Sequence, residues 1–164
     1  MTIGVIGSGS WWSALVKILT DNEHQVIWCV RSEKLAEHIR TRHHNPKYLS
    51  SVYFDNKVLS ITTDPEAVYA QAEAVVIAVP SAYAEGYIEP YLQQIAKGVK
   101  IVSAVKGILP SKNMLLNERL AMFPGVDLNN YVTIMGPCHA EEVAAEKLSY
   151  LTFAGINAQV TETI

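Results

Sequence analysis

The sequence has little charge, few cysteines and no long apolar run, and each scarcity excludes a class of protein. Asp, Glu, Lys and Arg make up 18% of the 164 residues and leave a net charge of −3, so no basic field favours nucleic acid as a partner. The longest apolar run covers residues 74–79 and is too short to cross a bilayer. Cys29 and Cys138 lie far apart without a disulfide or metal-ligand pattern, so we expect reduced thiols in a cytoplasmic protein.

The remaining composition is sufficient for a folded domain. Apolar residues make up 49% of the chain, which is ordinary for a globular protein with a core. We expect residues 1–164 to form one domain. A strand is expected from residue 2, which argues against an export signal at the N-terminus. The adjacent His43 and His44 do not share a helical face, and no Cys or carboxylate follows at ligand spacing, so no metal site is expected.

The chain is organised around a glycine turn near its N-terminus. The apolar run 3–6 ends at Gly7, Gly9 follows, and apolar residues at helical spacing come next. Strand, glycine turn and helix in this order are the context of a dinucleotide-binding site. Gly7 would allow the tight turn, and Gly9 would let the backbone approach a diphosphate. The amides of Ser10 and Trp11 would then begin a helix whose positive end faces the phosphates.

The third glycine of the G-x-G-x-x-G fingerprint is missing. It should fall at position 12, where this chain has Trp12. Because that glycine normally permits close packing of helix on strand, the indole must point away or push the helix off the sheet. A plain glycine turn without a ligand is the alternative interpretation of these residues.

Alternating strand and helix patterns predict an α/β fold. We expect a Rossmann-like, doubly wound, mostly parallel sheet of about seven strands with helices on both faces. The expected strands cover residues 2–6, 25–30, 58–61, 74–79, 100–105, 131–135 and 148–155. One helix is expected directly after the glycine turn, and another begins at residues 64–66. Further helices are expected over residues 33–42, 87–97, 110–121 and 141–147, and a polar tail ends the chain.

Several expected strands end in polar or glycine residues, where an open parallel sheet binds its ligands. Arg31 could stack on adenine and pair with a 2′-phosphate, or it could be a solvated arginine beside Ser32 as a helix N-cap. Tyr83 lies where a nicotinamide would sit, or it is an ordinary aromatic residue on a helix. Lys106 is placed to meet an anionic or carbonyl substrate. A second glycine turn, residues 136–140, forms a further candidate anion site before a helix.

Short blocks in a fixed order carry a resemblance to a known family. The blocks are Gly7-Ser8-Gly9-Ser10-Trp11, Asn45-Pro46-Lys47-Tyr48-Leu49, Val79-Pro80-Ser81, Val105-Lys106-Gly107-Ile108 and Gly136-Pro137 with Ala140. The set resembles the NAD(P)-dependent glycerol-3-phosphate dehydrogenases of the bacterial type, over nearly all of residues 3–145. The resemblance implies NAD or NADP as the cofactor. It also implies reversible reduction of dihydroxyacetone phosphate to sn-glycerol 3-phosphate, which supplies the glycerol backbone of phospholipids.

The resemblance also implies roles for individual residues. The cofactor-binding residues would be Gly7, Gly9, Ser10, Trp11, Arg31, Tyr83, Lys106 and Ala140. The substrate-binding residues would be Lys106, Gly136 and Cys138, the last at a position where a serine is usual. The family's main catalytic lysine lies in a helical C-terminal domain beyond residue 164, so we expect this chain to fold without turnover. The resemblance leaves a homo-oligomer of the full-length enzyme open.

Two other interpretations stay open at this point. Trp12 and the low charge favour a degenerate Rossmann module that binds no dinucleotide and recruits a partner helix. A related dehydrogenase of the 6-phosphogluconate or hydroxyisobutyrate type shares the Gly-x-Gly start. It fits the blocks at Lys106 and Gly136 less well.

Overall fold

The computed structural model describes all residues from 1 to 164 and confirms the α/β fold with a single seven-stranded sheet. The strands are β1 (Thr2–Ile6), β2 (Gln25–Cys29), β3 (Leu59–Thr62), β4 (Ala74–Ile77), β5 (Lys100–Ser103), β6 (Tyr131–Met135) and β7 (Thr152–Gly155). Their order in the sheet is β3-β2-β1-β4-β5-β6-β7. All neighbouring pairs are parallel except β6 and β7, which are antiparallel.

The strand order reverses between β1 and β4, and this reversal positions the site. Chain connections leave β1 and β4 in opposite directions along the sheet, so a crevice opens beyond their carboxyl ends. Ile6, the last residue of β1, is paired with Cys29 of β2 and Ile77 of β4. The ends of these three strands therefore lie side by side at the same edge.

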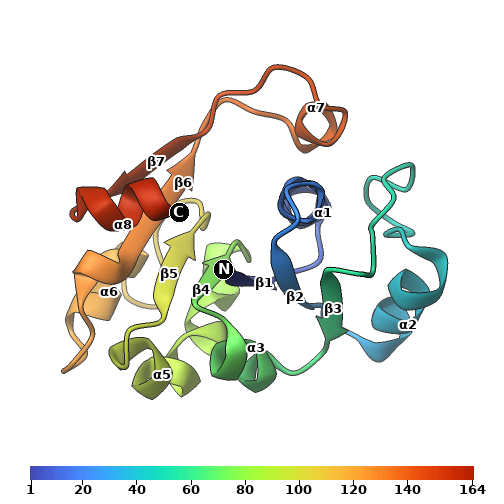
Figure 1. Ribbon diagram of the computed structural model, residues 1–164. Helices are drawn as coiled ribbons and strands as arrows, with labels where there is room; N and C mark the ends of the chain where they lie inside the picture. The colour runs from blue at the N-terminus through green and yellow to red at the C-terminus, as the bar shows by residue number, and fades with distance from the viewer.

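Helices lie on both faces of the sheet, with α1 on one side and α3 and α5 on the other (Figure 1). The α-helices are α1 (Ser10–Asp21), α2 (Glu33–Arg42), α3 (Pro65–Gln71), α4 (Ser81–Ala84), α5 (Leu92–Ala96), α6 (Leu116–Ala121), α7 (Ala140–Ala144) and α8 (Ala158–Thr163). Three 3₁₀ turns are η1 (Glu85–Tyr87), η2 (Glu89–Tyr91) and η3 (Leu128–Asn130). None of these helices combines the length and the hydrophobicity of a membrane-spanning helix.

Capping side chains determine where the helices that follow β2 and β3 begin. The Ser32 side chain accepts a hydrogen bond from the Leu35 amide and caps α2. The Asp64 carboxylate accepts from the Glu66 amide at 2.9 Å, and Pro65 occupies the first turn of α3. These caps satisfy amides that have no acceptor within their own helix.

The core lies on both faces of the central strands. Every residue of β4 is buried, as a central parallel strand requires. Trp28 in β2 is fully buried and meets the ring of Phe54 edge to face, with centroids 5.2 Å apart. A Cβ on Gly4 would lie 2.2 Å from Cγ1 of Val68, so glycine lets α3 pack directly on β1.

Several predicted element boundaries were wrong. The expected helix 87–97 is broken into η1, η2 and α5, because Pro90 in η2 lacks the amide that a continuous helix needs. Residues 110–115 form a turn closed by pairing of Leu109 with Met114, and only 116–121 is helical. The last strand begins at Thr152 rather than at residue 148, and α7 ends at Ala144. The expected polar tail contains α8, which the Asn157 side chain caps at the Val160 amide.

Candidate functional site

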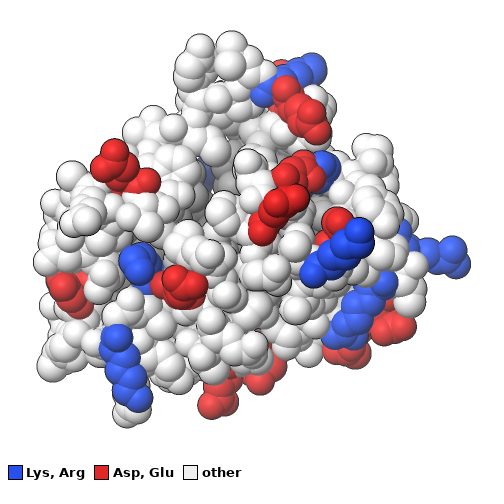
Figure 2. Space-filling view, viewed as in Figure 1, with Lys and Arg blue, Asp and Glu red and all other residues white.

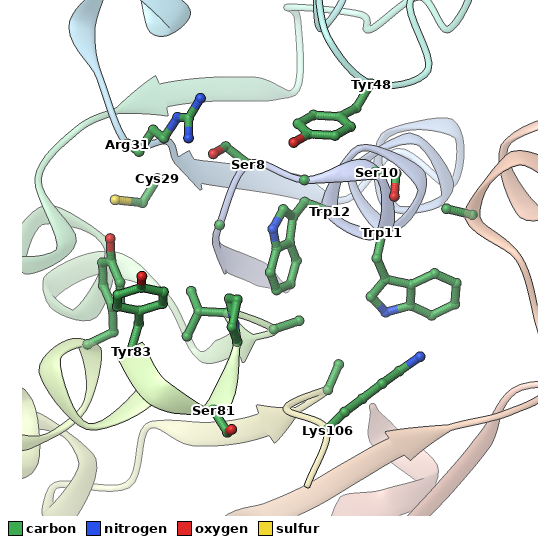
Figure 3. Close-up of a pocket in the computed structure, with 18 of the residues that line it drawn as sticks. Ser8, Ser10, Trp11, Trp12, Cys29, Arg31, Tyr48, Ser81, Tyr83 and Lys106 are labelled. Atoms are coloured by element: carbon green, nitrogen blue, oxygen red, sulfur yellow. The ribbon is translucent and has the colours of Figure 1, made fainter. Parts of the chain in front are cut away.

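A cavity of about 930 Å³ opens at the carboxyl edge of the sheet and collects most of the predicted site residues (Figure 3). Its lining comes from the turn after β1, the ends of β2, β4 and β5, and the start of α7. The predicted residues in the lining are Gly7, Gly9, Ser10, Trp11, Arg31, Tyr83, Lys106, Cys138 and Ala140. The expected common crevice is therefore present in the fold.

Gly136 does not line this cavity. Its Cα faces the carbonyl oxygen of Tyr150, because an added Cβ would lie 2.3 Å from that oxygen. The Cys138 thiol donates to the same carbonyl at 3.0 Å. These contacts hold the segment after β6 against the segment before β7. The substrate-binding role expected for Gly136 stays a prediction.

The glycine turn after β1 is fixed by hydrogen bonds from β2. Gly7 has a positive φ of 136°, which a glycine adopts without the steric cost of a side chain. Its amide donates to the Cys29 carbonyl at 3.0 Å, and its carbonyl accepts from the indole N–H of Trp28 at 2.7 Å. The turn is therefore held in one conformation by the strand beside it.

The N-terminus of α1 carries free hydrogen-bond donors. Gly9 is the N-cap and has no side chain to accept from the first turn. The amides of Ser10, Trp11 and Trp12 have no acceptor in the protein, and the first amide to be bonded is that of Ser13, to Gly9 at 3.3 Å. Free amides at the positive end of a 12-residue helix suit an anion such as a diphosphate. The residues present thus fit a dinucleotide.

Asn45 links the glycine turn to the loop that follows α2. It is fully buried, and its amide nitrogen donates to the Ser13 hydroxyl at 3.1 Å and the Ser8 carbonyl at 3.4 Å. Its side-chain oxygen accepts from the amides of Lys47 at 3.0 Å and Tyr48 at 3.3 Å. Because Tyr48 lines the cavity, Asn45 couples one wall of the site to the turn.

The Trp12 indole points into the turn rather than away from the sheet. The residue is 5% exposed and lines the cavity. A Cβ on Gly7 would lie between 2.2 and 2.5 Å from three atoms of the indole, so the ring lies directly against Gly7. The absence of a side chain at Gly7 accommodates the indole beside the turn.

The charges in the cavity lining are mostly positive. The lining contains two cationic side chains, Arg31 and Lys106, and one carboxylate, that of Glu141. Neither Arg31 nor Lys106 forms an ion pair within the protein. Burial, and then the nearby Asp64 carboxylate, raises the pKa of the Cys29 thiol to about 11, so this lining residue is neutral at pH 7.

The molecular face shown in Figure 2 carries charged side chains of both signs among large uncharged areas. No group of three or more His, Cys, Asp or Glu side chains is arranged to bind a metal ion.

Sequence reasoning missed part of the lining. The lining residues not predicted as site residues are Ser8, Trp12, Cys29, Tyr48, Ala78, Val79, Pro80, Ser81, Tyr87, Ala104, His139 and Glu141. Ser8, His139 and Glu141 adjoin predicted residues, so the strand-end pattern could have included them. Tyr48 reaches the cavity from the loop after α2 and Tyr87 from η1, and no periodicity reveals either position.

Comparisons with known proteins agree with this geometry. Residues 2–161 match the family described as NAD-dependent glycerol-3-phosphate dehydrogenase N-terminus. The chain is 32% identical over 162 residues to a glycerol-3-phosphate dehydrogenase [NAD(P)+] of Corynebacterium aurimucosum, covering 99% of this chain and 48% of that protein. It is 32% identical to the protein of the same name from Chlorobium chlorochromatii, covering 100% of this chain and 49% of that protein. The crystal structure of a glycerol-3-phosphate dehydrogenase from Coxiella burnetii superposes with a TM-score of 0.88 at 26% identity, covering 99% of this chain and 49% of that chain.

Proposed function

Because the chain belongs to the family of the NAD-dependent glycerol-3-phosphate dehydrogenase N-terminus, we propose that its cavity binds NAD or NADP. The observation that carries the proposal is the set of free amides at the start of α1, beside a glycine turn at the point where the strand order reverses. The cavity volume of about 930 Å³ lies within the range of ligand sites.

The lining residues divide along the length of such a coenzyme. Gly7, Gly9 and the amides of Ser10 and Trp11 would hold the diphosphate. Arg31, beyond the end of β2, would lie by the adenosine, where its guanidinium tolerates a 2′-phosphate. Tyr83, Lys106 and Ala140 would contact the nicotinamide half. In Figure 3, Arg31 and Lys106 lie on opposite sides of the glycine turn, as this division requires.

The reaction is proposed for an enzyme that includes this chain, since the chain spans about half the length of the curated relatives it matches. The coenzyme would supply or accept a hydride, with dihydroxyacetone phosphate and sn-glycerol 3-phosphate as the substrate pair. The ammonium group of Lys106 would hold the substrate, with Gly136 and Cys138 nearby. The expected setting is phospholipid synthesis in the cytoplasm, with the main catalytic lysine in the other half of the enzyme.

Tryptophan fluorescence tests the proposal on the 164-residue chain. Trp11 and Trp12 line the cavity, so bound NADH should quench the tryptophan emission. The emission of NADH itself should rise by energy transfer from these tryptophans. Saturation of this signal at micromolar to sub-millimolar NADH or NADPH is the expected result. A flat titration up to millimolar coenzyme, with the fold intact, would favour a degenerate module that binds a partner instead.

A further inference from the structure

Trp12 stands where the dinucleotide fingerprint has its third glycine, and its indole lies along the inner side of the glycine turn. A Cβ on Gly7 would lie 2.2 Å from Cε2 and 2.4 Å from Nε1 of the indole. A Cβ on Gly9 would lie 3.4 Å from the same Nε1, which is ordinary contact. The nitrogen edge of the indole therefore lies beside both glycines, next to the free amides of α1.

The N–H of this indole has no acceptor in the protein. Trp28, which lies beside the same turn, donates its N–H to the Gly7 carbonyl at 2.7 Å. Trp12 is 95% buried, yet no hydrogen bond from its Nε1 exists. Nε1 of Trp12 is not among the fully buried side-chain atoms that lack a hydrogen-bond partner; those atoms belong to other residues. Because Trp12 lines the cavity, its Nε1 is open to the cavity. A buried indole N–H normally finds a partner, and here only a molecule in the cavity can supply one.

We propose that Trp12 is a coenzyme contact, whose indole N–H donates to the diphosphate that the free amides of Ser10 and Trp11 also bind. This inference rests on the proposed function. In Figure 3 the indole lies between Arg31 on one side and Lys106 on the other, on the path that an extended dinucleotide would follow. The cavity retains about 930 Å³ with the indole in place, so the ring forms its floor without filling it. The position of the third glycine thus carries a side-chain donor in this chain.

Indole N–H signals in proton–nitrogen correlation spectra test the contact directly. The chain has three tryptophans, and single Trp-to-Phe variants assign their three signals. We expect the Trp12 signal to move downfield on addition of NADH or of ADP-ribose, which retains the diphosphate. AMP, which lacks the diphosphate, should move it much less. A Trp12 signal that NADH leaves in place while other signals shift would overturn the inference and leave the proposed function intact.

Two variants measure what the indole contributes to affinity. Trp12→Phe keeps an aromatic ring but removes the N–H, and we expect the dissociation constant for NADH to rise about tenfold. Trp12→Gly restores the fingerprint, and we expect it to bind no more tightly than the wild type. Tighter binding by Trp12→Gly would show that the indole obstructs the site and would overturn the inference alone. Failure of all three proteins to bind NADH would overturn the proposed function as well. If Trp12→Phe does not fold, the wild-type spectra decide the question.

Discussion

The side-chain amide of Asn45 lies 3.1 Å from the hydroxyl oxygen of Ser13, and this contact ties the loop after α2 to the helix after the glycine turn. Two segments that are separate in sequence thereby form one wall of the cavity. Because Asn45 is fully buried, each of its polar atoms must have its partner within the protein.

Replacement of Asn45 should therefore destabilise the fold. Asn45→Ala leaves the Lys47 and Tyr48 amides and the Ser8 carbonyl without their partner, and we expect a loss of about 2 kcal/mol in the free energy of unfolding. Asn45→Asp keeps the acceptor but places a carboxylate against the Ser8 carbonyl, so its loss should be larger, about 3 kcal/mol. Urea unfolding measures both.

Asn22→Ala is the matched control for Asn45. The Asn22 side chain is exposed and donates only to the Ile18 carbonyl at the end of α1. Asn22→Ala should therefore lower the free energy of unfolding by only about 0.5 kcal/mol. Equal losses at both positions would show that the Asn45 contacts are not a specific support of the site.

Gly4→Ala tests the close packing of α3 on β1. The added methyl group would lie 2.2 Å from Cγ1 of Val68 and 3.2 Å from Cβ of Ala72, so we expect a loss of about 1–3 kcal/mol on urea unfolding. Gly86→Ala is the control, because nothing lies within 4 Å of its added Cβ and the change should be within about 1 kcal/mol. A neutral Gly4→Ala would contradict the packing described for these elements.

The two cysteines should react with thiol reagents at very different rates. Cys29 is 4% exposed and its pKa is raised to about 11, so at pH 8 it is both enclosed and protonated. Cys138 is partly exposed, so we expect it to account for the fast phase of labelling in the folded protein. A fast phase that persists in Cys138→Ser would contradict this assignment.

The raised pKa of Cys29 also gives a pH dependence of stability. The unfolded thiol ionises near its usual value of 9.0, while the folded thiol holds its proton to about pH 11. The contribution of the protonated Cys29 thiol to the free energy of unfolding is therefore fully present below about pH 9 and is lost as the pH rises through about 11. In urea unfolding between pH 8 and 11, Cys29→Ala should lose less stability with rising pH than the wild type, and parallel curves would contradict the assignment.

Lys106→Gln should weaken coenzyme binding if Lys106 faces the bound coenzyme. The side chain is exposed in the cavity lining and pairs with no carboxylate, so its removal should raise the dissociation constant for NADH about fivefold at low salt. Lys97→Gln is the control, since Lys97 precedes β5 while Lys106 follows it, at the opposite edge of the sheet. Equal effects of the two changes in a fluorescence titration would indicate a general charge effect only.

The sequence was sufficient to predict the doubly wound, mostly parallel sheet and the shared cavity because its strong signals are local. The short apolar runs at Ile3–Ile6 and 74–79 favour buried strands, and the glycine turn lies directly after the first of them. It failed where a helix pattern competed with a turn, as at Pro90 and Asn113, which has a φ of +52°. It also missed α8, whose polar sequence carries little apolar periodicity.

The Trp12 side chain shows a second limit of sequence reasoning. The fingerprint defines where the third glycine belongs, yet it does not determine the direction of a larger side chain at that position. The direction depends on the space beside Gly7, which only the folded turn defines. The network of Asn45 was equally hidden, because its partners come from two separate segments.

Calorimetric titration of NADH into the wild-type chain and into Gly9→Val tests most directly whether the glycine turn binds a coenzyme. Gly9 has a φ of −85° that valine can adopt, so the variant should keep its melting temperature while its side chain occupies the approach to the Ser10 and Trp11 amides. We predict one saturable site per wild-type chain and at least about tenfold weaker binding by Gly9→Val. A folded wild-type chain that takes up no NADH, or a variant that binds as well as the wild type, would contradict the account.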